Sequence, residues 1–100
     1  MRIDFDWDPA KAASNAAKHG VTFEEAMQIF RDPFARSILD HDSGSREERW
    51  VTIGETPGGH LLVVVHTWAD IEPDRTEVRI ISVRSPTAGE ARQYRERPMP

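Results

Sequence analysis

The chain has 100 residues, which is enough for one small domain and too few for two. It contains no cysteine, which excludes a disulfide framework and a thiolate metal site and fits a reducing compartment such as the cytoplasm. Its net charge of −4 argues against a long basic surface for duplex DNA, although residues 79–100 hold five arginines and two glutamates.

The N-terminus predicts a half-buried strand, because apolar Ile3, Phe5 and Trp7 alternate with charged residues. This acidic, alternating start does not resemble a secretory signal. No segment of the chain approaches the roughly 20 apolar residues that a membrane span needs. We therefore expect no association with a membrane.

Two helices are predicted next, over about residues 9–18 and 23–31. Asp8 suits an N-cap position, and Gly20 can adopt the left-handed conformation that ends a helix. Thr22 begins a capping-box pattern ahead of the second helix. These signals place a short connection between the two helices.

The second half of the chain predicts a mostly antiparallel sheet followed by a short helix. Strands are expected at 35–39, 49–55, 60–68 and 78–83, a loop at 41–45, a longer turn at 70–75, and a helix at 87–96. The apolar run at 61–65 indicates a central strand that is covered on both faces. Together the elements predict an α+β fold in one domain, residues 1–97, with a frayed tail at 98–100.

Three polar side chains share one face of the predicted first helix. Lys11, Asn15 and Lys18 are spaced i, i+4 and i+7. A solvated polar stripe is one interpretation of this pattern. A cationic ridge that meets a phosphate backbone or an acidic partner is the other.

Histidine and arginine residues near strand and helix ends are the candidates for chemistry. His66 and His19 suit proton transfer near neutral pH, although each could instead have a structural role. Arg79 and Arg84 suit phosphate binding. Residues five apart on a regular strand point to opposite faces, so these arginines can share a site only if a bulge intervenes or Arg84 lies beyond the strand. The histidines show no paired spacing, so no metal site is predicted.

The aromatic residues allow two interpretations. Tyr94 could stack on a base or accept a proton, or it could pack the last helix onto the sheet. Trp7, Trp50 and Trp68 are interpreted as core or sheet-surface residues.

One family resemblance covers nearly the whole chain. Residues 7–26 read W-D-P-x-K-x-x-x-N-x-x-K-H-G-V-x-F-x-E-A, and similar blocks follow at 48–54, 61–67, 78–84 and 90–94. This pattern resembles the BrnT toxins, a branch of the RelE/ParE-like toxins of type II toxin–antitoxin systems. The resemblance implies a RelE-like fold and a ribonuclease that inhibits translation by cutting RNA. The absence of cysteine and the dispersed histidines predict that it cuts without a metal, and no cofactor is expected.

The resemblance and the residue chemistry together give two sets of site residues. The catalytic set is His66, Arg79, Arg84 and His19, and the RNA-binding set is Lys11, Lys18, Arg92 and Tyr94. We expect His66 and the two catalytic arginines to converge with the end of the first helix on one concave surface.

The resemblance also implies a partner. A cognate antitoxin of the ribbon-helix-helix type would neutralise the toxin and supply DNA binding, with a possible 2:2 assembly. Two alternatives remain open: a ParE-like binding module that poisons a protein target, and an inactive toxin that serves as a repressor subunit. The residues His66, Arg79 and Arg84 favour the enzyme over both alternatives.

Overall fold

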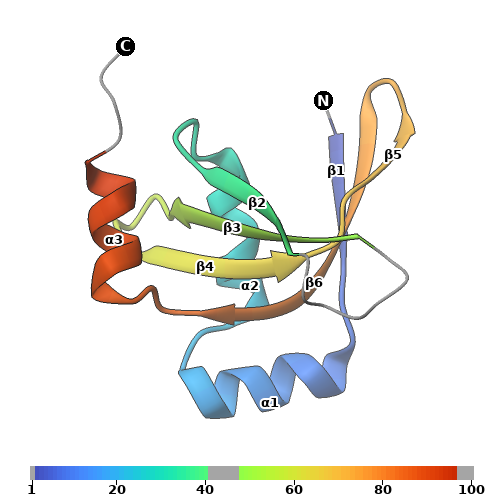
Figure 1. The fold of residues 1–100 in the computed structure, drawn as a ribbon. Coiled ribbons are helices and arrows are strands. Elements are labelled where there is room, and N and C mark those ends of the chain that lie inside the picture. The colour runs from blue at the N-terminus through green and yellow to red at the C-terminus, as the bar shows by residue number, and fades with distance from the viewer. Residues whose placement is uncertain (1, 41–47, 97–100) are drawn as a thin grey trace.

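The computed structural model describes residues 2–40 and 48–96, which form one sheet with helices packed against it (Figure 1). The elements in chain order are β1 (Arg2–Asp6), α1 (Pro9–His19), α2 (Phe23–Met27), the 3₁₀ helix η1 (Gln28–Arg31), β2 (Arg36–Asp40), β3 (Arg49–Glu55), β4 (Leu61–His66), β5 (Ala69–Glu72), β6 (Arg75–Arg84) and α3 (Ala88–Arg95). The expected loop at 41–45 and the expected tail at 98–100 lie outside the described residues.

The helix caps agree with the sequence prediction. The Asp8 side chain accepts a hydrogen bond from the Ala10 N–H at 2.9 Å, and Gly20 ends α1 with φ of 71°. Thr22 and Glu25 form a complete capping box at the start of α2. The sharp turn between α1 and α2 therefore follows from local side-chain chemistry.

The second helix is shorter than predicted, because it tightens into η1 after Met27. Gly54 of β3 lies directly against this turn. A Cβ atom at Gly54 would be 2.9 Å from the Ile29 Cβ, so the absence of a side chain lets η1 approach the sheet closely. Asp32 then ends the turn by accepting a hydrogen bond from the Phe34 N–H at 2.8 Å.

The sheet has the strand order β1-β6-β4-β3-β2, and β5 pairs with β6 beside this path. Only the β1–β6 pair is parallel among the described strands. The prediction of a central, covered strand is confirmed, because β4 lies between β6 and β3 and Leu61 to Val64 are all buried.

The prediction of a long turn at 70–75 is wrong. The chain leaves β4 at His66 and forms β5, which turns at Pro73 and Asp74 into β6. The Asp70 carboxylate holds this hairpin by accepting a hydrogen bond from the Thr76 hydroxyl at 2.8 Å. Proline therefore marked a tight hairpin turn rather than a longer loop.

Helices α1, α2 and η1 cover one face of the sheet. We call the face covered by α1, α2 and η1 the inner face and the opposite one the outer face. The inner-face core is formed by Val21, Phe23, Ala26, Ile29, Leu62, Val64, Val78, Ile80 and Val83. Helix α3 lies at the end of the sheet away from β1 and β5 (Figure 1).

Asn15 does not belong to an exposed stripe on α1, because only 8% of it is exposed. Its amide accepts from the Val83 N–H at 3.1 Å and donates to the Val83 carbonyl at 2.8 Å. A third hydrogen bond reaches the Val21 carbonyl at 3.3 Å. Asn15 thus anchors α1 to β6, while Lys11 and Lys18 are exposed.

Candidate functional site

A β-bulge in β6 sets the direction of the two catalytic-candidate arginines. In the β4–β6 pair, Val65 lies opposite Ser82 but His66 lies opposite Ile80, so β6 has one extra residue. Because of this extra residue, Arg79 and Arg84 point to the same face of the sheet although they are five positions apart. Both arginines therefore lie on the outer face, which settles the alternative that the sequence left open.

Each of these arginines pairs with a carboxylate. Arg79 forms an ion pair with Asp6 of the neighbouring strand β1, and both side chains are largely exposed. Arg84 donates to both oxygens of Glu90, at 2.8 and 3.0 Å. A phosphate that takes up both Nη groups of Arg84 must therefore displace Glu90, whereas Asp6 engages only Nη1 of Arg79.

The Arg84 hydrogen bonds lower the pKa of Glu90 from 4.5 to about 2, and the Thr87 N–H contributes in the same direction. Glu90 also completes the capping box of α3. The same carboxylate thus joins the end of β6 to the start of α3.

Replacing Glu90 by glutamine should lower the free energy of unfolding at neutral pH by about 1–2 kcal/mol, a value reduced for the partial exposure of the pair. Because the pKa is lower in the folded state, the stabilisation is complete above pH 4.5 and is lost as the pH falls toward 2. Urea titrations across this range should show that the difference in the free energy of unfolding between wild type and Glu90→Gln shrinks as the pH falls. A deficit that stays constant would assign the effect to helix capping rather than to the ion pair.

His66 lies on the inner face, and only 2% of it is exposed. It faces the same way as its partner Ile80, and Arg79, the residue before Ile80 in β6, faces the opposite way. The expected convergence of His66 with the two arginines on one concave surface is therefore wrong. The sheet itself separates the imidazole from both guanidinium groups.

Hydrogen bonds occupy both ring nitrogens of His66. Nδ1 lies 2.9 Å from the Thr67 carbonyl oxygen, and Nε2 lies 2.6 Å from the Thr52 hydroxyl. The Thr52 hydroxyl in turn lies 2.6 Å from the hydroxyl of Ser37 on β2. Burial lowers the pKa of His66, with the Thr67 carbonyl partly opposing this effect, so the ring is neutral at pH 7.

A cavity of about 250 Å³ opens above this network. Its lining residues are Ser37, Trp50, His66 and Trp68, and we call it the tryptophan pocket. Trp68 is 38% exposed, and its ring centre lies 6.4 Å from that of His66. Two indoles and a hydroxyl beside an imidazole form a surface suited to a flat heterocycle.

The tryptophan pocket was not predicted from the sequence, because Trp50 and Trp68 were interpreted as core or sheet-surface residues. A signal was present in the hairpin. A turn centred on Gly58 places Trp50 opposite His66, and this is the observed register. Trp68 follows His66 by two residues and so shares its side of the chain. Ser37 and Thr52 carried no comparable signal.

Trp68 also borders a second cavity, where Arg79 lies among the carboxylates of Asp4, Asp6, Glu48 and Glu77. Four carboxylates and one guanidinium disfavour a polyanion. The tryptophan pocket lacks charged lining residues and is the better candidate for a nucleobase.

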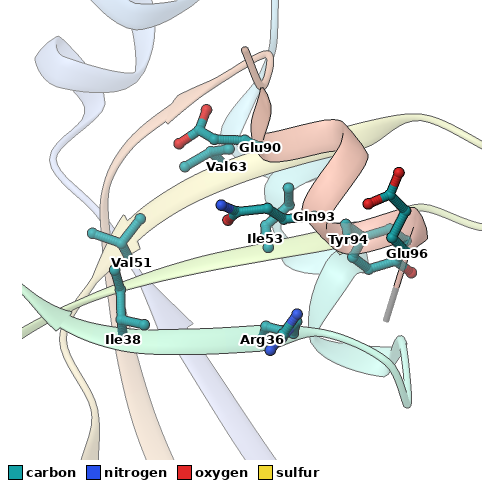
Figure 2. A pocket seen from close by; sticks show the side chains of 9 residues that line it. All are labelled: Arg36, Ile38, Val51, Ile53, Val63, Glu90, Gln93, Tyr94 and Glu96. Atoms are coloured by element: carbon teal, nitrogen blue, oxygen red, sulfur yellow. The ribbon is translucent and has the colours of Figure 1, made fainter. Parts of the chain in front are cut away.

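The outer face carries a groove of about 430 Å³ beside α3 (Figure 2). Its floor is apolar and is formed by Ile38, Val51, Ile53 and Val63. Tyr94 lines the groove but is only 4% exposed, and its hydroxyl donates to Asp32. These contacts agree with the packing interpretation of Tyr94.

The other predicted site residues lie apart from the tryptophan pocket lining. Lys11, Lys18 and His19 are exposed on α1, and Arg92 is exposed on α3. They form no ion pair with another described residue. No group of three potential metal ligands occurs in residues 2–40 and 48–96, and no described helix is long and apolar enough to span a membrane.

The structure is thus a small α+β domain with a buried, hydrogen-bonded imidazole beneath an indole-lined pocket. The sequence model of one protein family, described as "Ribonuclease toxin, BrnT, of type II toxin-antitoxin system", matches residues 7–90. The chain therefore belongs to the BrnT family and is a ribonuclease toxin of a type II toxin–antitoxin system. Membership implies a protein antitoxin as partner.

A solved structure shows the same fold. The 1.1 Å crystal structure of the Brucella abortus ribonuclease toxin BrnT has 24% sequence identity and a TM-score of 0.62. The match covers 87% of this chain and 99% of the Brucella chain. A comparison with curated protein sequences found no match.

Proposed function

We propose that this toxin cuts RNA at the tryptophan pocket without a metal ion, and that it thereby inhibits translation in the cytoplasm. The reaction is attack of a 2′-hydroxyl on the adjacent phosphodiester, which leaves a 2′,3′-cyclic phosphate. The observation that carries this proposal is the pocket itself, which brings His66 and two indoles together in a family of ribonuclease toxins.

Each part of the pocket has a chemical role. An RNA base stacks on Trp68, an interaction worth about 1–3 kcal/mol for a base on an aromatic ring. His66 is neutral at pH 7 and so accepts the proton that the 2′-hydroxyl loses. The pocket then supplies base binding and proton transfer, and phosphate contacts must come from elsewhere.

Exposed cations supply the phosphate contacts in this proposal. Arg84 exchanges its Glu90 partner for a phosphate of RNA that crosses to the outer face, since this partly exposed ion pair contributes only about 1–2 kcal/mol. Phosphate contact by Arg79 stays a prediction, because four carboxylates line the same cavity. Long-range attraction by the exposed cations Lys11, Lys18 and Arg92 guides RNA. The catalytic role of His19 stays a prediction. RNA contact by Tyr94 stays a prediction, with its packing against Asp32 the supported role.

The RelE-like fold group and the type of antitoxin are part of the same proposal. We assign the fold to the RelE-like group on the resemblance of its blocks. The antitoxin is a ribbon-helix-helix protein that contacts α1 or α3, binds DNA for both proteins and forms a 2:2 assembly. The acidic balance of the toxin, −4, supports DNA contact through the antitoxin alone.

A second candidate is a non-enzymatic module that binds a protein target in the manner of ParE-like toxins, or a repressor subunit. The acidic net charge and the pairing of both outer-face arginines with carboxylates favour it. Such a module would leave RNA intact.

Cleavage of a 5′-labelled, mixed-sequence single-stranded RNA should continue in excess EDTA and yield 2′,3′-cyclic phosphate ends. The reason is that the proposed chemistry uses protein groups for proton transfer and charge stabilisation. Single-stranded DNA of the same sequence lacks the 2′-hydroxyl and is the matched control, which should remain uncut. Loss of cleavage in EDTA with recovery on adding a divalent ion would contradict the proposal, and intact RNA in every condition would favour the binding module.

A further inference from the structure

The buried histidine cannot touch RNA directly with either ring nitrogen. Nδ1 is occupied by the Thr67 carbonyl at 2.9 Å and Nε2 by the Thr52 hydroxyl at 2.6 Å. Its exposed fraction is only 2%, and the Phe30 ring stands edge-on at 4.8 Å between centres. Any proton that reaches His66 from the pocket must pass through another group.

The direction of each hydrogen bond follows from the chemistry of its partners. The Thr67 carbonyl can only accept, so Nδ1 carries the proton of the neutral ring. Nε2 is then an acceptor, and the Thr52 hydroxyl must donate to it. Since Thr52 has a single hydroxyl proton, Ser37 donates to Thr52. The chain of donors runs from Ser37 through Thr52 to His66.

The same network accommodates a protonated His66. Once Nε2 gains a proton it becomes a donor, and the Thr52 oxygen can accept from it while Thr52 donates back to Ser37. Nδ1 keeps its bond to the Thr67 carbonyl. Every ring N–H therefore has a partner in both protonation states, which a site that exchanges protons requires.

Ser37, the first donor of this hydrogen-bond network, is accessible from the pocket. Ser37 is exposed on β2, the last strand in the sheet order, and it lines the tryptophan pocket. Thr52 is only 2% exposed. Phe30 and Trp68 make ring contacts with His66, and Trp50 and Ile80 lie opposite it on the neighbouring strands. Thr52 and Thr67 supply its hydrogen bonds, and none of these groups is charged.

We propose that Ser37 takes the proton of the RNA 2′-hydroxyl and that Thr52 passes the displaced proton on to His66. This inference rests on the proposed function, since it supplies the route to the base assigned there. Ser37 is then the group that contacts the reacting hydroxyl, and Thr52 is a positioning residue.

The proton transfer balances. The 2′-oxygen forms a bond to phosphorus as its proton moves to Ser37, the Ser37 proton moves to Thr52, and the Thr52 proton moves to His66 Nε2. The bond from phosphorus to the 5′-oxygen breaks, and water protonates that oxygen. The imidazolium later returns its proton to solvent along the same hydroxyls.

The test compares Ser37→Ala with wild type on the labelled single-stranded RNA. Removing an exposed hydroxyl from an edge strand leaves Thr52 able to donate to His66, so a merely structural network predicts unchanged cleavage. The relay instead predicts a loss of about 10²-fold, within the range of general acid–base effects. The rise of the rate with pH through the His66 pKa should flatten in the variant. Ser37→Thr, which keeps the hydroxyl, should restore the rate to within a few-fold.

Two further variants separate the possible failures. Thr52→Val should lose as much activity as Ser37→Ala and should shift the ¹⁵N resonance of His66 Nε2, and Ser14→Ala on the exposed side of α1 is the neutral control. If His66→Gln abolishes cleavage while Ser37→Ala retains full rate and an unchanged pH profile, the relay is overturned and the proposed function stands. If His66→Gln itself cuts normally, the proposed role of His66 fails and the relay fails with it.

Discussion

Replacing His66 by glutamine should reduce the rate of RNA cleavage by about 10²–10⁴-fold, the usual contribution of a general acid or base. The glutamine amide can still accept from Thr52 and donate to the Thr67 carbonyl, so the hydrogen bonds that fix this strand end have substitutes. It cannot take up a proton at neutral pH. The variant therefore removes the proposed chemistry with limited damage to packing. Single-turnover cleavage of the labelled RNA measures the effect.

His60→Gln is the matched control, because His60 is an exposed histidine in the same hairpin. It should cut RNA at the wild-type rate. Thermal unfolding followed by circular dichroism establishes that both variants are folded. A folded His66→Gln protein with wild-type cleavage would leave His66 a structural residue of the sheet and would favour the binding-module alternative.

Local patterns predicted most of the fold, because they depend on residues close together in the sequence. The caps at Asp8, Gly20 and Thr22 all form as expected. The prediction for the segment after His66 was wrong for a non-local reason. Its strand character comes from pairing with β6 and from the bond between Asp70 and Thr76, and neither appears in the local pattern.

The candidate site was harder to predict than the fold, because it depends on which face each side chain takes. Alternation alone could not orient Arg79 and Arg84, since a single extra residue in β6 reverses the result. Sequence position also gave no sign that Arg79 would pair with Asp6, which is 73 positions earlier. His66 was identified as a candidate, but the hydroxyls of its hydrogen-bond network, Thr52 and Ser37, come from two other strands.

The Asn15 amide acts as a substitute strand beside β6. Strand β1 pairs with β6 only as far as Asp6 opposite Arg79, so none of the described strands borders this edge of β6 beyond that point. The Asn15 side chain offers one acceptor and one donor to the N–H and carbonyl of Val83, as a peptide group would. The hydrogen-bonded connection between α1 and β6 therefore runs through one buried side chain.

Replacing Asn15 by alanine should lower the free energy of unfolding by about 2–4 kcal/mol, because it leaves several buried backbone groups without partners. For a domain of this size the melting temperature should fall by about 10–25 °C. Ser14→Ala, one position away on the exposed side of α1, should change stability by no more than about 0.5 kcal/mol. Asn15→Asp should be destabilised as well, and less so in acid, because a protonated carboxyl regains a donor for the Val83 carbonyl. Urea and thermal unfolding of the three variants distinguish these outcomes. If Asn15→Ala has the same melting temperature as wild type, the amide does not hold α1 against β6. Packing of Val21 and Phe23 must then hold the helix alone.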